Sequence, residues 1–256
     1  MLEIGLKERV SELYVKYGFR ASPVLDQYFI INEGVIERAI RYADVTKDDA
    51  VLEIGPGLAF ITRELARKAG KVIAIEYDKR LERLLREEMK EFSNFELIMG
   101  DALKVTFPNF NKVVSAIPYS ASAPITFKLL DYDFDVAVLF FQKEFGEKML
   151  AQPCEHEYGR LSVMAQYYFD VEMKEVIPRS LFYPQPKVDS VVISLKKKKS
   201  VKRDPGFDAF IREVFRYKNK NVSNAVKLGV GKNVDDERKV DSLEVSELRE
   251  LYEKLK

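Results

Sequence analysis

The chain has 256 residues, 46% of them hydrophobic and 32% charged, which is typical of a globular protein with one large domain or a main domain and a small annex. A net charge of +1 provides no bulk attraction to nucleic acid, so any such affinity requires a local patch. The lone cysteine excludes an internal disulfide, and no apolar run approaches the ~20 residues of a membrane span. Since the N-terminus is charged, unlike a secretory signal, we expect a cytoplasmic protein with no membrane partner.

Two helices are expected before the first strand, and residues 1–45 form a helical lead-in to the main domain. The first helix covers about residues 2 to 17, and Gly18 can end it. Its apolar side chains recur on one face at Leu2, Leu6, Val10, Leu13 and Tyr17. The second helix starts after Asn32, because an Asn side chain can accept a backbone N–H at the N-cap position.

Seven short runs predict strands. Five of them are apolar and lie at 50–55, 71–76, 95–100, 112–117 and 135–141. Amphipathic stretches typical of helices follow the first, second and fourth, and this alternation favours a parallel sheet with helices on both faces. The remaining runs, 169–177 and 187–196, alternate polar and apolar residues and predict an antiparallel end to the sheet.

The composition changes sharply after Leu195. The stretch KKKKSVKRDPG is typical of a linker, and the segments FDAFIREVFRYK, NKNVSNAVKLG and VSELRELYEKL beyond it predict three short helices. The sequence therefore predicts an α/β main domain at 1–196 and a small basic helical C-terminal domain at 197–256.

Three strand ends carry residues that suit a nucleotide-like ligand. Gly55 and Gly57 join the first strand to a helix and let the backbone approach a ligand closely. Glu76 ends the next strand and can accept both hydroxyls of a ribose, while Asp101 can accept from an adenine amino group. Phe60 breaks the G-x-G-x-x-G phosphate-binding pattern. Singly these residues also fit a tight turn, a solvated acid or a helix cap, but together they predict S-adenosylmethionine, an adenosyl ligand without phosphates.

From residue 26 to residue 226 the chain resembles the small-subunit ribosomal RNA adenine N6,N6-dimethyltransferases of the archaeal type. The resemblance depends on the motifs VLEIGPGLAFIT, IEYD, GDALK, IPYSASAPITFKLL, QKEFGEKMLAQP, YGRLSVMAQ and FYPQPKVDSVV. It implies a seven-stranded, mostly parallel, Rossmann-like class I methyltransferase sheet. The erythromycin-resistance methyltransferases share much of this chemistry and are a competing assignment.

The resemblance also implies which residues hold the cofactor. They are Tyr28, Ile30, Gly55, Gly57, Glu76, Asp101, Ala102 and Ala116. Tyr28 stands where the family usually has Asn or His, and Ile30 stands where it has Leu.

The segment Ala116-Ile117-Pro118-Tyr119 takes the place of the family's Asn-(Leu/Ile)-Pro-(Tyr/Phe) motif. In the family the Asn oxygen and a backbone carbonyl accept the hydrogens of the adenine amino group, whose lone pair is delocalised into the ring. The motif aromatic stacks on a flipped base, and Phe182 resembles the second aromatic of that sandwich. The implied catalytic residues are therefore Ala116, Ile117, Pro118, Tyr119 and Phe182.

Ala116 has no side-chain acceptor, and the loss of such a positioned contact commonly costs ~10²–10³ in rate. The stretch 120–123, in which Ser122 alone is kept, and Tyr28 also depart from the family pattern. Departures clustered in this way favour natural divergence over a single engineered change. We expect the ancestral activity in weakened form.

Basic residues gather late in the chain, with eleven basic and three acidic side chains between Lys196 and Lys227. An excess of this sign favours a phosphate backbone, although a solvated linker would also explain the lysine run. The predicted RNA-binding residues are Lys197, Lys198, Lys202, Arg203, Arg216, Lys218 and Lys220.

No metal site is expected, because His156 is the sole histidine and no cysteine cluster is present. The sequence predicts a monomer that binds the small ribosomal subunit and dimethylates two adjacent adenines near the 3′ end of its RNA during ribosome biogenesis. Two alternatives remain. One is a weakened or inactive paralogue that acts as an RNA-binding assembly factor, and the other is an adenine N6-methyltransferase for another RNA.

Overall fold

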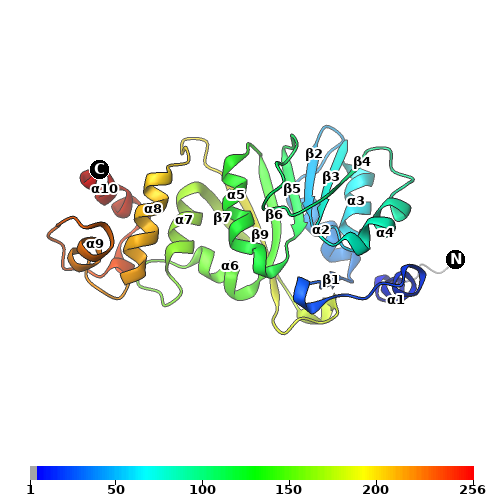
Figure 1. Cartoon of the computed structure of the whole chain (residues 1–256), viewed down its shortest axis with the longest axis horizontal. Helices are drawn as coiled ribbons and strands as arrows, with labels where there is room; N and C mark the ends of the chain where they lie inside the picture. The colour runs from blue at the N-terminus through cyan, green and yellow to red at the C-terminus, as the bar shows by residue number, and fades with distance from the viewer. Residues whose placement is uncertain (1–4) are drawn as a thin grey trace. The chain divides into compact units, whose positions relative to one another are not determined.

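The computed structural model describes residues 5–256 (Figure 1). The chain divides into two compact units, and the residues of each unit lie close to one another in space. The first consists of the chain up to Lys143 together with Met173–Lys196, and the second consists of Glu144–Glu172 and Lys197–Lys256. The assignment of residues 1–196 and 197–256 as separate domains stays a prediction.

A seven-stranded sheet has the order β4-β3-β2-β5-β6-β9-β7. Its strands are β2 (Ala50–Ile54), β3 (Lys71–Glu76), β4 (Phe95–Met99), β5 (Lys112–Ala116), β6 (Val136–Gln142), β7 (Phe169–Ile177) and β9 (Ser190–Lys197). Strands β2 to β6 pair in parallel, and β9 runs antiparallel to β6. The predicted seven-stranded, mostly parallel sheet is confirmed.

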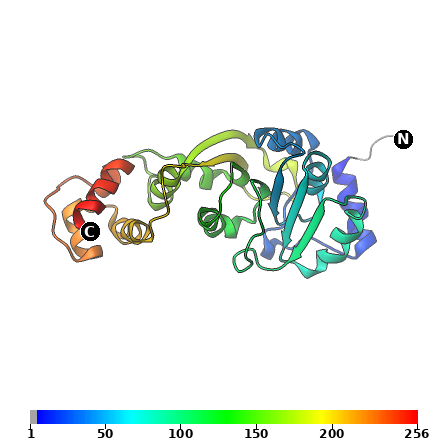
Figure 2. The ribbon, with the colours of Figure 1, turned by 90° about the horizontal axis from the view of Figure 1, so that it is seen from above.

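The strand register brings the functional strand ends to one edge. Ile54 lies opposite Ile75, Glu76 opposite Met99, and Ala116 opposite Phe140. Strands β2, β3, β5 and β6 are almost entirely buried, as expected for parallel strands covered on both faces. Figure 2 shows helices on both sides of these strands.

The helices of the first unit follow the predicted pattern closely. They are α1 (Leu6–Tyr17), α2 (Glu33–Tyr42), α3 (Phe60–Lys68), α4 (Glu82–Glu88) and α5 (Ser122–Lys128). Asn32 caps α2 as predicted, because its side chain accepts from the Val35 N–H at 3.0 Å. Gly18 ends α1 at a φ of 62°, and Leu2, expected at the start of this helix, lies outside the described residues.

Two helices, α6 (Lys143–Leu150) and α7 (Arg160–Tyr168), precede the three predicted at the end of the chain. Those three are α8 (Pro205–Val214), α9 (Val222–Val230) and α10 (Val245–Leu255). The Arg249 guanidinium lies over the rings of Tyr167, Phe207 and Tyr252 and so holds α7, α8 and α10 together. No helix within residues 5–256 is long and apolar enough to cross a membrane.

A second, two-stranded sheet was not predicted. Strand β1 (Phe29–Ile30) pairs antiparallel with β8 (Phe182–Tyr183), so that Ile30 lies opposite Phe182. Strands of two residues are too short to show a period in the sequence. This pairing fixes the N-terminal segment next to the edge where the parallel strands end.

Glu88 on α4 is the charged centre of the contact between α1 and α4. Its carboxylate accepts from Arg9 at 2.6 Å, Lys16 at 2.8 Å and the Tyr17 hydroxyl at 2.8 Å. Burial raises the pKa of this carboxyl, but the hydrogen bonds from Lys16, Tyr17 and Arg9 outweigh burial and lower the pKa to about 2.

Glu88→Gln is expected to lower the free energy of unfolding at pH 7. Because the folded-state pKa of about 2 lies below the ordinary value of 4.5, the stabilisation is complete above pH 4.5 and disappears as the pH falls toward 2. Urea unfolding at several pH values checks this. Glu82→Gln, which removes an exposed ion pair with Arg86 on the same helix, is the control and has little effect. A stability difference that persists unchanged at pH 2 would contradict the assignment.

Candidate active site

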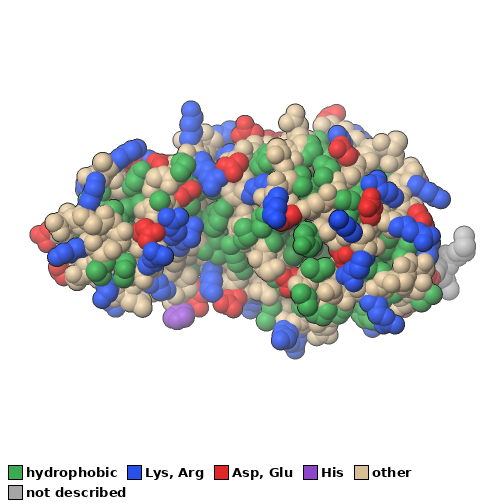
Figure 3. All heavy atoms as spheres, viewed as in Figure 1, with side chains coloured by type: hydrophobic (Ala, Val, Ile, Leu, Met, Phe, Trp, Pro, Cys, Tyr) green, Lys and Arg blue, Asp and Glu red, His purple; other side chains and the backbone are tan. Residues whose placement is uncertain are grey.

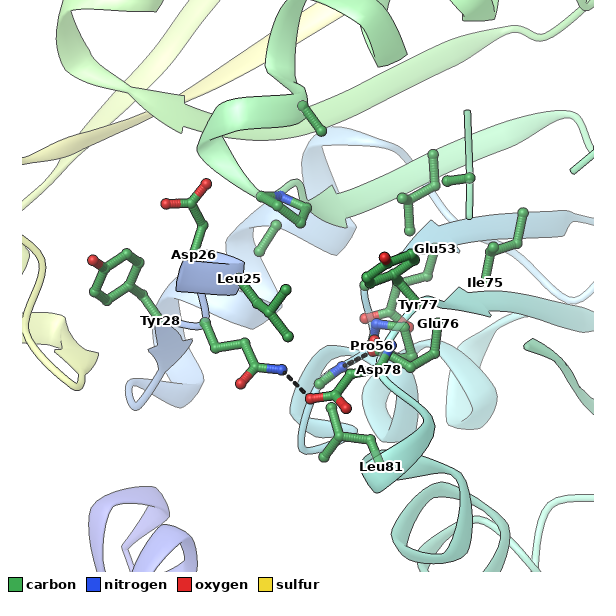
Figure 4. Close-up of a pocket in the computed structure, with 18 of the residues that line it drawn as sticks. Leu25, Asp26, Tyr28, Glu53, Pro56, Ile75, Glu76, Tyr77, Asp78 and Leu81 are labelled. Atoms are coloured by element: carbon green, nitrogen blue, oxygen red, sulfur yellow. Dashed lines mark hydrogen bonds between the residues drawn. The ribbon is translucent and has the colours of Figure 1, made fainter. Parts of the chain in front are cut away.

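A cavity of about 310 Å³ lies where the parallel strands end. Gly55, Glu76, Asp101 and Ala116, from the ends of four neighbouring strands, all line it. The N-terminal segment lines its other side, and Figure 4 shows Leu25, Asp26 and Tyr28 across from Pro56, Glu76 and Asp78. The parallel register therefore brings together the strand-end residues that the sequence singled out.

The loop from β2 to α3 requires its glycines. Gly55 and Gly57 have φ values of 74° and 56°, in the left-handed region that other residues avoid. A Cβ at position 57 would also lie 2.7 Å from the Phe29 ring. Ala59 adopts a φ of 65° at the start of α3 although it has a side chain. At Gly55 and Gly57, therefore, no side chain covers the backbone of the loop at the edge of the cavity.

Glu76 is 5% exposed and stabilises this loop. Its carboxylate accepts from the Gly57 N–H at 3.3 Å and from the Asp78 N–H at 2.7 Å. Burial raises the pKa of the carboxyl, whereas the backbone donors oppose that shift. Two ionised oxygens offer about four acceptor positions, so capacity remains for hydroxyl groups of a ligand.

Asp101 and Ala102 follow β4, in a loop that Lys128 fixes. The Asp101 carboxylate accepts from the Leu103 N–H at 2.9 Å. The Lys128 ammonium, at the end of α5, donates to the carbonyls of Ala102 at 2.7 Å and Val105 at 2.5 Å. Burial lowers the pKa of Lys128. One side chain therefore joins the loop after β4 to the helix that follows the Ala116–Tyr119 segment.

The ionisable groups of the cavity lining are mainly acidic, among many apolar residues. Five carboxyl groups contribute to it: Asp26, Glu53, Glu76, Asp78 and Asp101. No Lys, Arg or His is among the described residues that line it. Such a site disfavours a phosphate and suits a ligand that carries hydroxyls, amino groups or a positive charge.

Glu53 is the least satisfied of these acids. It is 1% exposed, and within residues 5–256 its Oε2 has no hydrogen-bond partner. Burial raises the pKa of its carboxyl to about 8. The unpartnered oxygen is itself buried, and the nearby Thr62 side chain opposes the rise in pKa, so Glu53 adds a largely neutral carboxyl group to the cavity near pH 7.

The Ala116–Tyr119 segment leaves β5 and borders the cavity. Ala116 and Pro118 line it, whereas Ile117 is buried in the core. The Tyr119 hydroxyl lies 2.7 Å from the Ser190 hydroxyl, on β9, and burial raises the pKa of Tyr119. Ser190 was missed because it lies 71 residues from Tyr119 in the sequence and no local pattern marks such a pairing.

The N-terminal segment is bound to both sides of the cavity. The Gln27 amide donates to the Asp78 carboxylate at 2.8 Å (dashed in Figure 4). The Asp26 carboxylate accepts from the Ser120 N–H at 2.8 Å. Neither Asp26 nor Asp78 was predicted as a site residue, although Asp78 is the last residue of the IEYD motif and Asp26 is the first residue of the stretch that resembles the family. Their proximity is set by tertiary structure alone.

Not every predicted residue lies at the cavity. Tyr28 and Ile30 line it, as the resemblance implies. Ile117, Tyr119 and Phe182 are absent from the cavity lining, and Phe182 is 3% exposed and packs in the core opposite Ile30. Its role as the second aromatic of a base sandwich stays a prediction.

The predicted RNA-binding side chains occur in the second unit and differ in their contacts. Lys198 donates to the Gln166 carbonyl at 2.7 Å, and Lys218 donates to the His156 carbonyl at 3.1 Å. Arg203 lies 3.5 Å from Asp208, Arg216 lies 2.6 Å from Glu213, and Lys197 is half-buried. Lys202 and Lys220 are exposed, and no contact with the described part of the chain occupies their ammonium groups.

Figure 3 shows basic side chains interspersed with acidic ones over the visible face of this unit. The imidazole of His156 is almost fully exposed (purple in Figure 3). Among residues 5–256 no group of three or more His, Cys, Asp or Glu side chains is arranged to hold a metal ion.

The strand order and the glycine and acidic residues at the strand ends define a class I methyltransferase fold. Residues 18–253 match the family described as ribosomal RNA adenine dimethylase. The chain belongs to this family.

Relatives and solved structures agree with this assignment. A probable ribosomal RNA small subunit methyltransferase A from Thermococcus onnurineus is 44% identical over 98% of both chains. A protein of the same name from Methanopyrus kandleri is 43% identical over 86% of this chain and 81% of its own. A dimethyladenosine transferase from Plasmodium falciparum superposes with a TM-score of 0.79 at 30% identity, covering 87% of this chain and 95% of that one. The 23S rRNA methyltransferase ErmE gives 0.68 at 28% identity, covering 89% and 99%.

Gly57→Ala is expected to destabilise the protein more than Gly18→Ala does. Both positions have positive φ, which costs roughly 1–2 kcal/mol for a residue with a side chain. Only at position 57 does the new methyl meet the Phe29 ring, since nothing lies within 4 Å of a Cβ at position 18. We expect a further ~1–3 kcal/mol from overpacking, measured by urea unfolding. Equal losses for the two variants would show that Phe29 moves aside freely.

Lys128→Met is expected to release the loop after β4, because the Ala102 and Val105 carbonyls lose a charged donor worth roughly 1.5–3 kcal/mol. Amide hydrogen exchange at residues 103–105 should accelerate by at least about tenfold. Lys104→Met, in the same loop but 85% exposed, serves as the control and leaves exchange nearly unchanged. Unaltered exchange in Lys128→Met would remove Lys128 from this role.

Proposed function

We propose that this protein transfers methyl groups from S-adenosylmethionine to N6 of two adjacent adenines near the 3′ end of small-subunit ribosomal RNA, as a step in ribosome biogenesis. The observation that carries the proposal is the cavity at the strand ends, which has five carboxyl groups and no basic residue in its described lining. The curated relatives, named as small subunit methyltransferases, favour this target over that of ErmE.

The residues at the cavity fit an adenosyl ligand with a positive charge. Glu76 would accept the ribose hydroxyls, Asp101 would accept the adenine amino group, and the bare Gly55–Gly57 loop would allow close approach. Glu53 would add a further carboxyl group to the lining beside this loop. When bound, the cofactor supplies an activated methyl group on a sulfonium. Tyr28, Ile30, Ala102 and Ala116 complete the lining.

The Ala116–Tyr119 segment would hold the target base. Tyr119 offers an aromatic face, and its hydroxyl is fixed by Ser190. The backbone carbonyls of this segment would accept hydrogens of the adenine amino group as its nitrogen attacks. No strong base is required, because the proton can leave after the methyl has transferred. With an alanine at 116, we expect slow transfer.

The exposed basic side chains of the second unit would contact the RNA backbone. Lys202 and Lys220 are the strongest candidates, since no contact with the described chain occupies their ammonium groups. Lys198 and Lys218 are already bound to backbone carbonyls and would contribute less.

Unmethylated small subunits incubated with labelled S-adenosylmethionine provide the direct test. Nucleoside mass spectrometry of the recovered RNA should show N6,N6-dimethyladenosine from two adjacent positions. Binding of the subunit without any transfer would instead identify an RNA-binding assembly factor, and label in another RNA would identify a different target.

Ala116→Asn is expected to raise the rate of transfer, by up to about 10²-fold, because it restores a side-chain acceptor at the end of β5. Ala116→Leu is the matched control, since leucine has nearly the shape of asparagine but no polar atom. Single-turnover kinetics on unmethylated subunits measures the effect. If both variants are equally slow, the space at position 116 is needed and the missing acceptor is not limiting.

A further inference from the structure

Two aromatic rings already stack at the border of the cavity. The rings of Tyr28 and Tyr119 have centroids 5.7 Å apart and planes inclined by 23°. Aromatic pairs in direct contact have centroid distances of about 4.5–7 Å, so nothing lies between these two rings. Both side chains are half-buried. Tyr28 therefore covers the aromatic face of Tyr119 in the free protein.

The two rings are held very differently. The Tyr119 hydroxyl is 2.7 Å from the buried Ser190 hydroxyl, and the next residue, Ser120, donates its N–H to Asp26. Nothing in residues 5–256 forms a hydrogen bond with the Tyr28 hydroxyl. Its backbone neighbours are anchored through Gln27 and strand β1, and its ring packs against the hydrophobic core. Tyr119 is thus held by a hydrogen bond through its hydroxyl, whereas the Tyr28 ring is held by apolar packing alone and is the easier of the two to displace.

Phe182 cannot easily supply a second aromatic face. It is 3% exposed, and its backbone pairs with Ile30 in the β1–β8 sheet. To expose its ring to a base, the protein would have to separate this sheet or open the core. Tyr28 is only half-buried and has to give up apolar packing, with no hydrogen bond and no strand pairing of its side chain to break.

We propose that Tyr28 supplies the second stacking wall for the target adenine, so that the base enters between Tyr28 and Tyr119. This inference rests on the proposed function of the same site. A base inserted between the two rings occupies about 3.4 Å, and the Tyr28 ring moves outward to make this space. In the free protein Tyr28 keeps the Tyr119 face covered, and in the complex it closes over the base. Because Ala116 offers no side-chain acceptor, stacking contributes a larger share of the binding free energy of the base than it would if position 116 were asparagine.

The test uses reconstituted unmethylated small subunits that carry 2-aminopurine in place of the first target adenine. Stacking quenches the fluorescence of this base. We compare the full-length wild type with Tyr28→Phe, Tyr28→Ala and Phe182→Leu. Wild type and Tyr28→Phe should quench, whereas Tyr28→Ala should lose most of the quenching and bind the subunit roughly 5- to 150-fold more weakly. Phe182→Leu keeps an apolar side chain in the core and should quench as wild type does.

Separate readouts distinguish the possible failures. Thermal unfolding shows whether each variant folds. Because Tyr28 also lines the cavity proposed for the cofactor, S-adenosylmethionine binding is titrated for each variant, and subunit binding and quenching are compared at saturating cofactor. Tighter subunit binding by Tyr28→Ala would overturn the proposal by showing that Tyr28 is only a plug. Loss of quenching in a folded Phe182→Leu, with normal quenching in Tyr28→Ala, would overturn it in favour of Phe182. Absence of quenching with the wild type would also overturn it. Quenching that depends on Tyr28 without methyl transfer would support the stacking role and refute the proposed activity.

Discussion

The parallel register of β2, β3, β4 and β5 is the constraint on which the site depends. It places the ends of four strands at one edge, so that Gly55, Glu76, Asp101 and Ala116 border a single cavity although they are spread over more than sixty residues. Side chains at the opposite ends of the same strands could not meet there. A slip of one residue in any pairing would turn the buried side chains of that strand to the other face of the sheet. The strand ends thereby contribute Glu53, Glu76 and Asp101 to the lining, and the N-terminal segment and the loop after β3 add Asp26 and Asp78.

The second constraint is the N-terminal segment that crosses the cavity. Its ends are fixed by the β1–β8 pair and by the hydrogen bonds from Gln27 to Asp78 and from Ser120 to Asp26. These contacts link the loop after β3 with the loop after β5. One short segment therefore joins two loops that border the cavity, and Lys128 makes a second link between the loop after β4 and α5.

The strong periodic features of the sequence predicted the fold well. Apolar runs and Asn32 located the strands and a helix start, because burial and capping act over a few residues. The strand-end residues of the cavity could also be predicted, since each follows a recognisable strand. Strands β1 and β8, Ser190 and the stacking of Tyr28 on Tyr119 could not be predicted. They depend on contacts between distant segments that leave no local period.

Calorimetric titration of the full-length protein with S-adenosylmethionine and, separately, with NAD tests the central claim most directly. A cavity with five carboxyl groups and no basic residue in its described lining should bind one S-adenosylmethionine per chain and show no saturable heat with NAD, whose phosphates it would repel. Saturable binding of NAD, or no binding of S-adenosylmethionine, would contradict the account of the strand-end site.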